Sequence, residues 1–382
     1  MNIGFDAKRI YQNTTGLGHY SRTLVASLAQ YHPEHEYYLF APKITPLFNT
    51  KGFTNIHPVE PAGFPSTLFK SAWRSSWVKK DLLKNNIDIY HGLSHEIPIG
   101  IQDTAVKTVV TIHDLIFERY PQQYSNIDIQ IYRKKFTYAC KHAGKIIAIS
   151  KQTRDDIIAF YKIPEDKISI CYQSCNPSFF ESVTDAAKAA VKIKYQLPEQ
   201  FYLYVGSVIE RKNLLTICKA IKELDNAIPL VVIGNGDGYL QKVKAYVQAN
   251  NLQQKIIFLS ETPAAKNSVD FKTAKDFPAI YQSAAAMIYP SIFEGFGIPV
   301  LEALASGLPT ITSNTSCLPE AGGNAALYID PLSVVEMKNA MTEIISNTAL
   351  KNDLIEKSFI HAQQFTQQHC AAEVMKVYKS LE

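Results

Sequence analysis

Residues 286–307, AMIYPSIFEGFGIPVLEALASG, place a strand, a turn and a helix in one uninterrupted run. The apolar residues 286–289 predict a buried strand, and a glycine-flanked turn after it contains Glu294. Pro299 favours the first turn of a helix, and Gly307 favours its end. A strand that leads directly into a helix is the repeating unit of a parallel sheet covered by helices.

The same alternation of short apolar runs and amphipathic stretches continues in both directions from this segment. In the first half the predicted strands are Asn2–Asp6, Glu36–Phe40, Asn55–Val59, Ile87–His91, Thr108–Ile112, Lys145–Ile149 and Ile168–Tyr172. In the second half they are Phe201–Val205, Leu230–Ile233, Lys255–Leu259, Ala286–Tyr289, Thr310–Thr312 and Ala326–Ile329. Two such series predict an α/β protein with two Rossmann-like parallel-sheet domains facing a cleft. The polar stretch 261–275 predicts a mobile loop.

A polar, Ala- and Lys-rich stretch, 181–200, separates the two series of strands, and we expect it to be the linker. The N-terminal domain is then predicted over 1–180 and the C-terminal domain over 201–365. The tail after the last predicted strand has helical periodicity. We expect its final helix, 366–382, to pack back across the N-terminal domain.

The composition of the 382 residues is that of a folded protein, with 46% hydrophobic and 19% charged residues. A net charge of +4 without a long run of one sign argues against a nucleic-acid partner. The six cysteines lack paired C-x-x-C spacing, so we expect reduced thiols, no disulfide framework and no zinc site. No segment has the pattern of a signal peptide or a membrane span, which predicts a cytoplasmic protein.

A first candidate site follows the first predicted strand, where Gly16 and Gly18 precede a helix that we expect from Tyr20 onward. Glycines let a backbone approach a phosphate, and a helix N-terminus favours its charge. Ser21 stands where the dinucleotide fingerprint needs its third glycine, and no acid follows the second strand. The pattern argues against NAD and leaves two interpretations open, a phosphate contact or a plain tight turn.

Histidines follow two of the predicted strands in the first half of the chain. His113 comes directly after the strand Thr108–Ile112, where its ring can donate a hydrogen bond to a hydroxyl or carbonyl of a ligand. A core histidine whose ring is satisfied by backbone groups is the alternative. His91 and His95 follow another strand, and the same two interpretations apply to them.

The first strand of the second half leads through Gly206 to the adjacent cations Arg211 and Lys212, just before a helix. Arginine grips oxygens as a fork and lysine supplies a compact charge, so this pair suits a diphosphate. The alternative is a pair of solvated loop residues.

The two carboxylates of the opening segment, Glu294 and Glu302, are eight residues apart. Eight residues of helix span roughly 12 Å. A retaining glycoside hydrolase needs its two carboxyl groups about 5 Å apart. The spacing therefore argues against a glycosidase and suits two contacts to one long ligand.

The segment FEGFGIPVLEALASG resembles the E-x7-E motif of the retaining GT-B glycosyltransferases of family 4, also called group 1. The run G-S-x-x-x-R-K-N at 206–213 resembles their diphosphate motif, although Ser207 stands where many members have arginine. The likeness covers nearly the whole chain in the same order. It implies the GT-B architecture, with an N-terminal domain that binds the acceptor and a C-terminal domain that binds the nucleotide sugar.

The resemblance also implies roles for individual residues. Glu294 would contact hydroxyls of the donor sugar, and Glu302 would bind the ribose hydroxyls of the nucleotide. Arg211 and Lys212 would hold the diphosphate, and His113 would hydrogen-bond the donor sugar. Other groups would let the ligands approach or would donate backbone amides to the sugar and its phosphate: Gly16, Gly18, Gly206, Gly295, Phe296 and Gly297.

The activity implied by the resemblance is retaining transfer of a hexose, of the mannose or glucose type, from a UDP- or GDP-sugar. The acceptor would be a glycan or a lipid-linked glycan of a surface polysaccharide. No Asp-x-Asp occurs in the chain, so we expect no metal and no cofactor, with protein cations compensating the diphosphate. A nucleotide-sugar epimerase with the same double-Rossmann plan is the alternative, and a nucleotide-binding module without catalysis is a further one.

Trp73 and Trp77 lie four residues apart beside several cations, among them Lys79 and Lys80. At helical spacing the two rings share one face. That face predicts a surface for a lipid-linked acceptor or an anionic membrane, in which case the protein lies at the inner face of the membrane. The alternative is an aromatic stripe packed on the core of the N-terminal domain.

Overall fold

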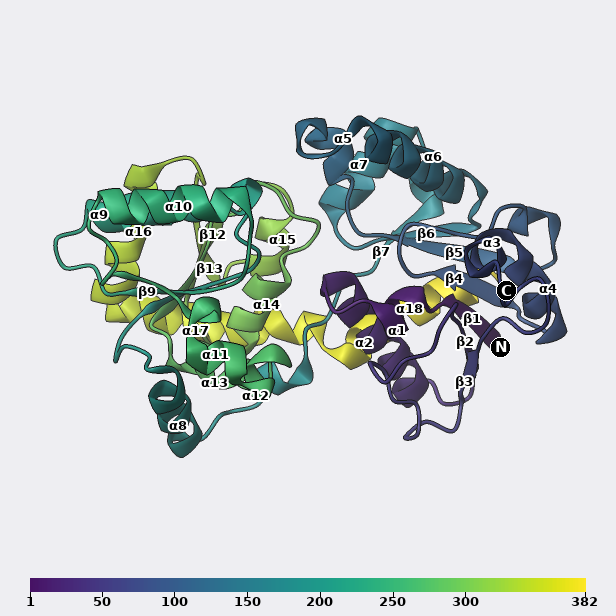
Figure 1. The fold of residues 1–382 in the computed structure, drawn as a ribbon, viewed down its shortest axis with the longest axis horizontal. Helices are drawn as coiled ribbons and strands as arrows, with labels where there is room; N and C mark the ends of the chain where they lie inside the picture. Colours follow the sequence, from purple (N-terminus) through teal and green to yellow (C-terminus); the bar gives the residue numbers. More distant parts are fainter. The chain divides into compact units, whose positions relative to one another are not determined.

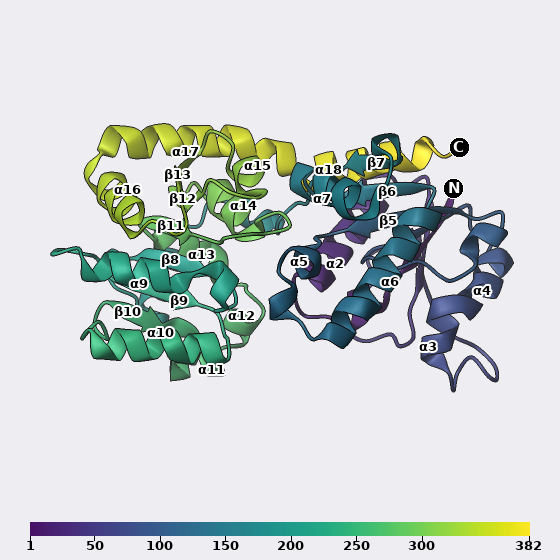
Figure 2. The same ribbon diagram turned by 90° about the horizontal axis from the view of Figure 1, so that it is seen from above.

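The computed structural model describes residues 1–382 and divides into two compact units, each of which we describe by itself. The first unit contains Met1–Ser174 and Thr366–Glu382, and the second contains Cys175–Phe365. In each unit, a fully parallel sheet has helices on both faces (Figures 1 and 2). The two Rossmann-like folds that the alternating sequence predicts are confirmed. No helix in the structure is long and apolar enough to cross a membrane.

The sheet of the first unit has seven strands in the order β3-β2-β1-β4-β5-β6-β7. They are β1 (Asn2–Asp6), β2 (Glu36–Phe40), β3 (Ile56–Val59), β4 (Ile89–Gly92), β5 (Lys107–Ile112), β6 (Lys145–Ala148) and β7 (Ile168–Ile170). In β1, Ile3 pairs with Tyr37 of β2 on one side and with Ile89 of β4 on the other. All carboxyl ends therefore lie at one edge, where parallel sheets bind their ligands.

Two separate cores cover the two faces of this sheet. Helices α1 (Lys8–Gln12), α2 (Gly16–Tyr31) and α18 (Gln367–Lys379) pack on one face. The other face is covered by the π-helical turn η1 (Trp73–Trp77), α4 (Val78–Lys84), α5 (Ile116–Arg119), α6 (Asn126–His142) and α7 (Lys151–Tyr161). The short helix α3 (Lys70–Ala72), which has no buried residue, precedes η1. The last helix, α18, lies against α2, so the C-terminal residues belong to the first unit.

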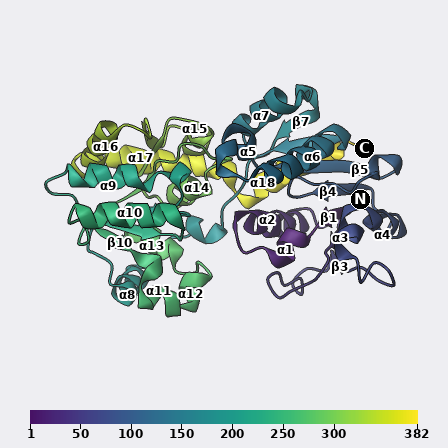
Figure 3. The same cartoon turned by 45° about the horizontal axis from the view of Figure 1, so that its top comes forward.

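The sheet of the second unit has the order β10-β9-β8-β11-β12-β13. Its strands are β8 (Tyr202–Val205), β9 (Leu230–Ile233), β10 (Ile256–Phe258), β11 (Ala286–Tyr289), β12 (Thr310–Ser313) and β13 (Ala326–Ile329). Its helices are α8 (Asp185–Tyr195), α9 (Leu214–Lys222), α10 (Gly238–Ala249), α11 (Pro263–Asn267), α12 (Val269–Lys272), α13 (Phe277–Ser283), α14 (Ile298–Ala305), α15 (Leu318–Gly322), α16 (Val334–Ser346) and α17 (Thr348–Ala362). Helices α9 and α10 lie on one face, and α13, α14 and α17 lie on the other (Figures 1 and 3).

Two stretches that the sequence predicted to be irregular are helical. The expected linker 181–200 contains α8, which packs on α13, and the chain passes between the units at Ser174–Cys175 instead. The expected mobile loop 261–275 contains α11 and α12, whose first turns are capped by Thr262 and Ser268. Polar composition was misleading at both places because short helices with hydroxyl caps need few apolar residues.

The two tryptophans have different surroundings. Trp73 is fully buried in the core of the first unit, and its indole Nε1 donates to Asp81 Oδ2 at 2.6 Å. Trp77 is 37% exposed. The turn between them is π-helical, because the amide of Val78 donates to the carbonyl of Trp73, five residues earlier instead of four. The two rings therefore do not lie on one face as they would in a regular α-helix. The alternative of an aromatic side chain packed on the core of the first unit therefore holds for Trp73.

Candidate functional site

The cations Arg211 and Lys212 lie in a short 3-10 turn (Glu210–Lys212) after β8, and Glu294 lies in the turn after β11. Because β8 and β11 are neighbours in the parallel sheet, their carboxyl ends bring these three side chains together. The backbone ties the two turns to each other, since the amide of Ile292 donates to the carbonyl of Arg211 at 2.8 Å. The sequence placed these residues at strand ends, and the fold joins them into one cluster.

Glu294 is the centre of this cluster, and one of its oxygens meets four partners. Its Oε1 lies 3.0 Å from Arg211 Nη1 and 3.7 Å from Lys212 Nζ. The hydroxyls of Ser291 and Tyr289 donate to the same oxygen at 2.7 and 3.0 Å. The side chains of Arg211, Lys212 and Glu294 are only 10%, 14% and 12% exposed, so these ion pairs are poorly screened by water.

Burial alone would raise the pKa of Glu294, but the charges of Lys212 and Arg211 and the Ser291 hydrogen bond together lower that pKa. Glu294 is therefore a carboxylate at neutral pH and accepts hydrogen bonds without donating any. Lys212 donates to Tyr289 Oη at 2.8 Å, and its ammonium also lies 5.2 Å from the centre of that ring. The tyrosine thus orders the lysine and the glutamate at once.

Two glycines of the resemblance shape the backbone around this cluster. Gly206 has φ +148°, and a β-carbon there would lie 3.0 Å from Lys212 Nζ. Gly297 has φ +110°, and a β-carbon there would lie 2.9 Å from Leu318 Cδ2. Both positions therefore favour glycine for conformation and for space.

The turn 294–297 is held open at the N-terminus of α14. Its Glu294 amide donates to Ser316 Oγ at 3.0 Å, and the Cys317 thiol donates to the carbonyls of Glu294 and Phe296, each at 3.1 Å. The amides of Gly295 and Gly297 donate to no group of the unit. Free amides at a helix N-terminus suit an anion. Ser316 and Cys317 were missed by the sequence analysis, since nothing in their pattern signals a contact with a turn twenty residues earlier.

Glu302 lies on α14, forms no ion pair with Arg211 or Lys212, and has a different hydrogen-bond partner. The Tyr281 hydroxyl donates to its Oε2 at 2.7 Å. Burial raises the pKa of Glu302 to about 7, an effect that the Tyr281 hydrogen bond and the Lys212 charge offset only in part. At neutral pH Glu294 is therefore fully ionised, whereas Glu302 is only partly ionised. This difference suits separate roles for the two groups.

In the first unit, His113 follows β5 and is buried, with both ring nitrogens occupied. The Gln173 side-chain amide lies 3.0 Å from Nδ1, and Nε2 lies 2.9 Å from the Leu93 carbonyl. Because an amide NH2 can only donate, Nδ1 is the acceptor and Nε2 bears the proton. Burial lowers the pKa of His113 to about 4, so the ring is neutral. Both ring nitrogens thus have partners within the first unit, one of them the Leu93 carbonyl and the other the Gln173 side chain, which the sequence does not predict.

His91 and His95 also have structural surroundings. His91 bonds to the hydroxyls of Tyr378 at 2.6 Å and Thr111 at 2.8 Å, which ties α18 to the sheet. The His95 ring stacks on Phe136 with centroids 4.2 Å apart. Burial lowers the pKa of both imidazoles, that of His91 to about 3.

Gly16 and Gly18 form the first turn of α2, which begins four residues before the predicted start at Tyr20. The Asn13 side chain closes this turn, since its Oδ1 accepts from the amides of Thr15 and Gly18, each at 3.0 Å. A β-carbon at Gly18 would collide with the Asn13 carbonyl, whereas one at Gly16 would meet nothing. Gly18 is thus explained by packing, and Gly16 lies in open space beside the helix N-terminus.

Two family models match the chain, one described as Glycosyltransferase Family 4 over residues 14–179 and one as Glycosyl transferases group 1 over residues 185–360. O-antigen chain mannosyltransferase B of Escherichia coli is 25% identical over 100% of both chains. O-antigen chain mannosyltransferase RfbU of Salmonella typhimurium is 29% identical over 65% of this chain and 63% of its own. The crystal structure of Anabaena HepE with UDP-glucose is 13% identical, with a TM-score of 0.75 over 100% of both chains.

Two Rossmann-like units and these likenesses define a glycosyltransferase of the GT-B class. The chain belongs to family 4 of these enzymes, also described as group 1, since the two family models together match most of its length. The matches give no support to the epimerase alternative.

Proposed function

We propose that the protein transfers a hexose from a nucleotide-diphosphate sugar to a glycan of a surface polysaccharide, with retention of configuration. The observation that carries this proposal is the cluster of Arg211, Lys212 and Glu294 beside the N-terminus of α14. The relatives named as O-antigen chain mannosyltransferases support mannose as the sugar and a surface glycan as the acceptor.

The cluster suits a diphosphate and a sugar at the same time. Without donor, the Glu294 carboxylate pairs with both cations and offsets only one of their two positive charges. A diphosphate that binds Arg211, Lys212 and the free amides of the turn competes for those cations, and sugar hydroxyls then replace them as donors to Glu294. Glu302, at the far end of the same segment, is proposed to accept hydrogen bonds from the ribose.

The proposed reaction follows from these charges. The bond between the anomeric carbon and the phosphate oxygen breaks, and the acceptor oxygen bonds to the same face of that carbon. The acceptor hydroxyl gives its proton to the departing phosphate oxygen. Arg211, Lys212 and the helix N-terminus stabilise the negative charge that develops on the diphosphate. Glu294 is ionised and so cannot protonate the leaving group.

We further propose that this charge compensation needs no metal ion. The residues that would have to ligate one, Glu294 and Glu302, are bound to Arg211 and Tyr281. No group of three His, Cys, Asp or Glu side chains in the structure has the arrangement of a metal site.

For His113 we propose a contact with the donor sugar that exchanges one hydrogen bond for another. A sugar hydroxyl takes the place of the Gln173 amide at Nδ1, while the Leu93 carbonyl keeps the ring in position. Removal of the competing amide in Gln173→Ala should then lower KM for the donor without loss of kcat. A variant with unchanged KM would leave His113 with a structural role alone.

We also propose that the protein docks on the anionic inner face of the cytoplasmic membrane through residues 64–83. Large apolar side chains are exposed there, namely Phe64 (83%), Leu68 (69%), Phe69 (52%), Trp77 (37%) and Leu83 (52%). Lys70, Lys79 and Lys80 lie in the same segment. Apolar insertion together with lysines near anionic headgroups is the pattern of a peripheral membrane contact.

Sedimentation with anionic vesicles tests this docking segment. Lys79→Glu/Lys80→Glu should reduce the bound fraction severalfold, whereas Lys219→Glu/Lys222→Glu, the same charge change on α9, should not. Equal binding by both double variants would refute the membrane contact.

The enzymatic proposal is tested in two stages. A thermal-shift panel of UDP, GDP, UDP-glucose and GDP-mannose identifies the nucleotide, because a ligand of the native state raises its stability by mass action. Release of that nucleotide is then measured with and without a glycan acceptor, and the anomeric configuration of the product is read by NMR. Acceptor-dependent release with retention supports the proposal, and isomerisation of the donor sugar without acceptor would support the epimerase instead.

A further inference from the structure

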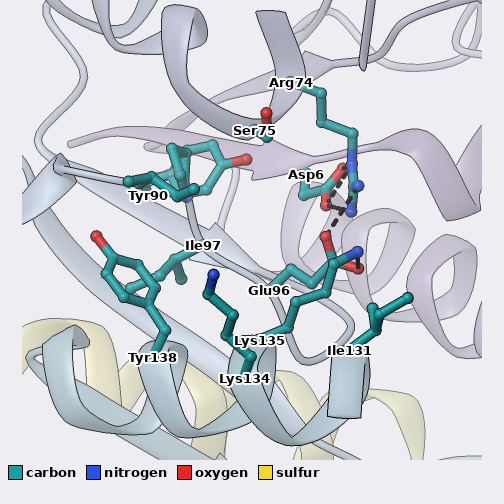
Figure 4. Close-up of a pocket in the computed structure, with 12 residues that line it drawn as sticks. Asp6, Arg74, Ser75, Tyr90, Glu96, Ile97, Ile131, Lys134, Lys135 and Tyr138 are labelled. Carbon is teal, nitrogen blue, oxygen red and sulfur yellow. Dashed lines mark hydrogen bonds and ion pairs between the residues drawn. The ribbon is translucent and has the colours of Figure 1, made fainter. Parts of the chain in front are cut away.

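A cavity of about 510 Å³ lies at the carboxyl ends of β1 and β4 in the first unit (Figure 4). Its walls come from the end of β1, the turn η1, the loop after β4 and one face of α6. The volume is within the range of about 300–1,000 Å³ in which small-molecule sites fall. Because it opens at the carboxyl edge of the sheet, it lies where α/β units place their ligands.

Most of the wall is apolar. Ile97, Pro98 and Ile99 form one side, and Ile131 and the ring of Tyr138 form the other. Ile99 and Ile131 are 59% and 45% exposed, so the mouth of the cavity is apolar as well. An aliphatic chain could enter between these two isoleucines and remain in contact with apolar atoms.

Two polar groups in the cavity have no partner in the protein. Tyr90 is only 2% exposed, yet its hydroxyl makes no hydrogen bond within the protein. Lys134 on α6 directs its ammonium group into the cavity and forms no ion pair with any carboxylate (Figure 4). Both residues line the cavity, so the Tyr90 hydroxyl and the Lys134 ammonium are available to a ligand there.

The other charged groups of the cavity satisfy one another. Arg74 bonds to Asp6 at 2.5 Å and to Glu96 at 3.1 Å, and Lys135 lies 3.2 Å from Glu96. These two cations and two carboxylates cancel. The charge of Lys134 is left over, so the cavity has a net positive charge beside an apolar wall.

We propose that this cavity binds the lipid-phosphate end of the acceptor, with the phosphate on Lys134 and the Tyr90 hydroxyl and the aliphatic chain between Ile99 and Ile131. Arg74 and Ser75 line the cavity from the same π-helical turn that exposes Trp77, so the site adjoins the segment 64–83. Only the statement that this ligand is the acceptor rests on the proposed function, since the chemistry of the cavity is independent of it.

Direct binding to the full chain tests the proposal, with butyl, hexyl and octyl phosphate below their micellar concentrations as probes. Each methylene that enters an apolar site tightens binding by up to about fourfold, so affinity should rise along the series. Octanol, which lacks the anion, and inorganic phosphate, which lacks the chain, should each bind at least about tenfold more weakly than octyl phosphate. Equal binding of octanol and octyl phosphate, or no binding of octyl phosphate, would overturn the proposal.

Three variants locate the site. Lys134→Ala should weaken octyl phosphate about three- to tenfold, and Lys141→Ala, on the same helix outside the cavity, should have no effect. Tyr90→Phe should weaken it about threefold to fivefold without loss of thermal stability, because that hydroxyl has no partner in the protein. Ile131→Asp, at an exposed position, should abolish chain-length dependence. Unchanged octyl phosphate affinity in Lys134→Ala and Ile131→Asp would refute the assignment.

Nucleotide binding measured on the same samples keeps this result apart from the proposed function. Binding of alkyl phosphates without binding of any nucleotide would support the cavity proposal and contradict the proposed donor site. Binding of nucleotide without binding of any alkyl phosphate would contradict the cavity proposal and leave the proposed donor site intact.

Discussion

Titration of Glu302 should make donor binding depend on pH near neutrality. Burial raises the pKa of this carboxyl to about 7. Ribose hydroxyls donate to a carboxylate, so the ionised form is the one that binds. About nine-tenths of the carboxyl is ionised at pH 8 and about one-tenth at pH 6, and donor affinity should therefore fall about tenfold between these values, the equivalent of about 1.4 kcal/mol.

Calorimetric titration with an intact nucleotide sugar is the appropriate assay. Both of its phosphates are esterified, whereas the terminal phosphate of a free nucleoside diphosphate titrates near pH 6 and would obscure the effect. Glu302→Gln should bind more weakly at pH 8 and lose the slope. Tyr281→Phe removes the hydroxyl that favours the carboxylate, so its profile should shift to higher pH.

Protein stability offers an independent measure of the same ionisation. The folded-state pKa of Glu302 is raised from 4.5 to about 7, so its contribution to stability is complete below pH 4.5 and is lost as the pH rises through 7. Glu302→Gln should therefore raise the unfolding free energy more at pH 8 than at pH 5, by up to about 3 kcal/mol. A flat affinity profile of the wild type between pH 6 and 8, or an unchanged slope in Glu302→Gln, would refute the reasoning.

Three further substitutions separate the roles within the second unit. Lys212→Ala should lower kcat about 100-fold or more, because it removes a buried cation at the proposed diphosphate site. Lys219→Ala, on the exposed face of α9, should leave kcat unchanged. Equal kcat values for the two variants would show that Lys212 does not bind the diphosphate. Glu294→Gln should impair turnover while nucleotide affinity, measured by calorimetry, is kept or improves, since the carboxylate no longer competes for Arg211; loss of nucleotide affinity alone would reverse the roles of the two glutamates. Gly297→Ala should lower the unfolding free energy by about 1–3 kcal/mol in denaturant titration, because φ is +110° and Leu318 is in the way; a neutral result would show that the turn relaxes.

The strands of both units could be predicted almost completely from the sequence. Parallel strands are buried on both faces and stand out as short apolar runs, such as 202–205 and 286–289. Their neighbours in the sheet could not be predicted from these runs. The order β8-β11 is what joins Arg211 and Lys212 to Glu294, and it is visible only in the fold.

Polar contacts between segments that are distant in sequence could not be predicted from the sequence pattern. Gln173 meets His113 and Ser316 meets Glu294 across 60 and 22 residues of sequence. No spacing or motif around Gln173 or Ser316 predicts these partners. The cavity around Tyr90 and Lys134 was missed for the same reason, since its lining comes from four separate segments.

The predicted helix boundaries are wrong where a helix begins with polar residues or glycines. Thr15 is extended ahead of Gly16, and Asn13 accepts the amide of Gly18, so α2 begins inside what looked like a glycine loop. Thr184 and Thr262 cap α8 and α11 in the same way. Hydroxyl and amide side chains are typical of loops, but here they accept hydrogen bonds from the first turns of helices.

Acceptor-dependent nucleotide release in EDTA tests the central claim most directly, because it requires donor binding, transfer and compensation of the diphosphate by protein groups at once. With the nucleotide sugar selected by the thermal-shift panel, release should require the glycan acceptor, persist in EDTA and change less than severalfold on addition of Mg²⁺ or Mn²⁺. Release that stops in EDTA and returns with added metal would contradict the roles assigned to Arg211 and Lys212.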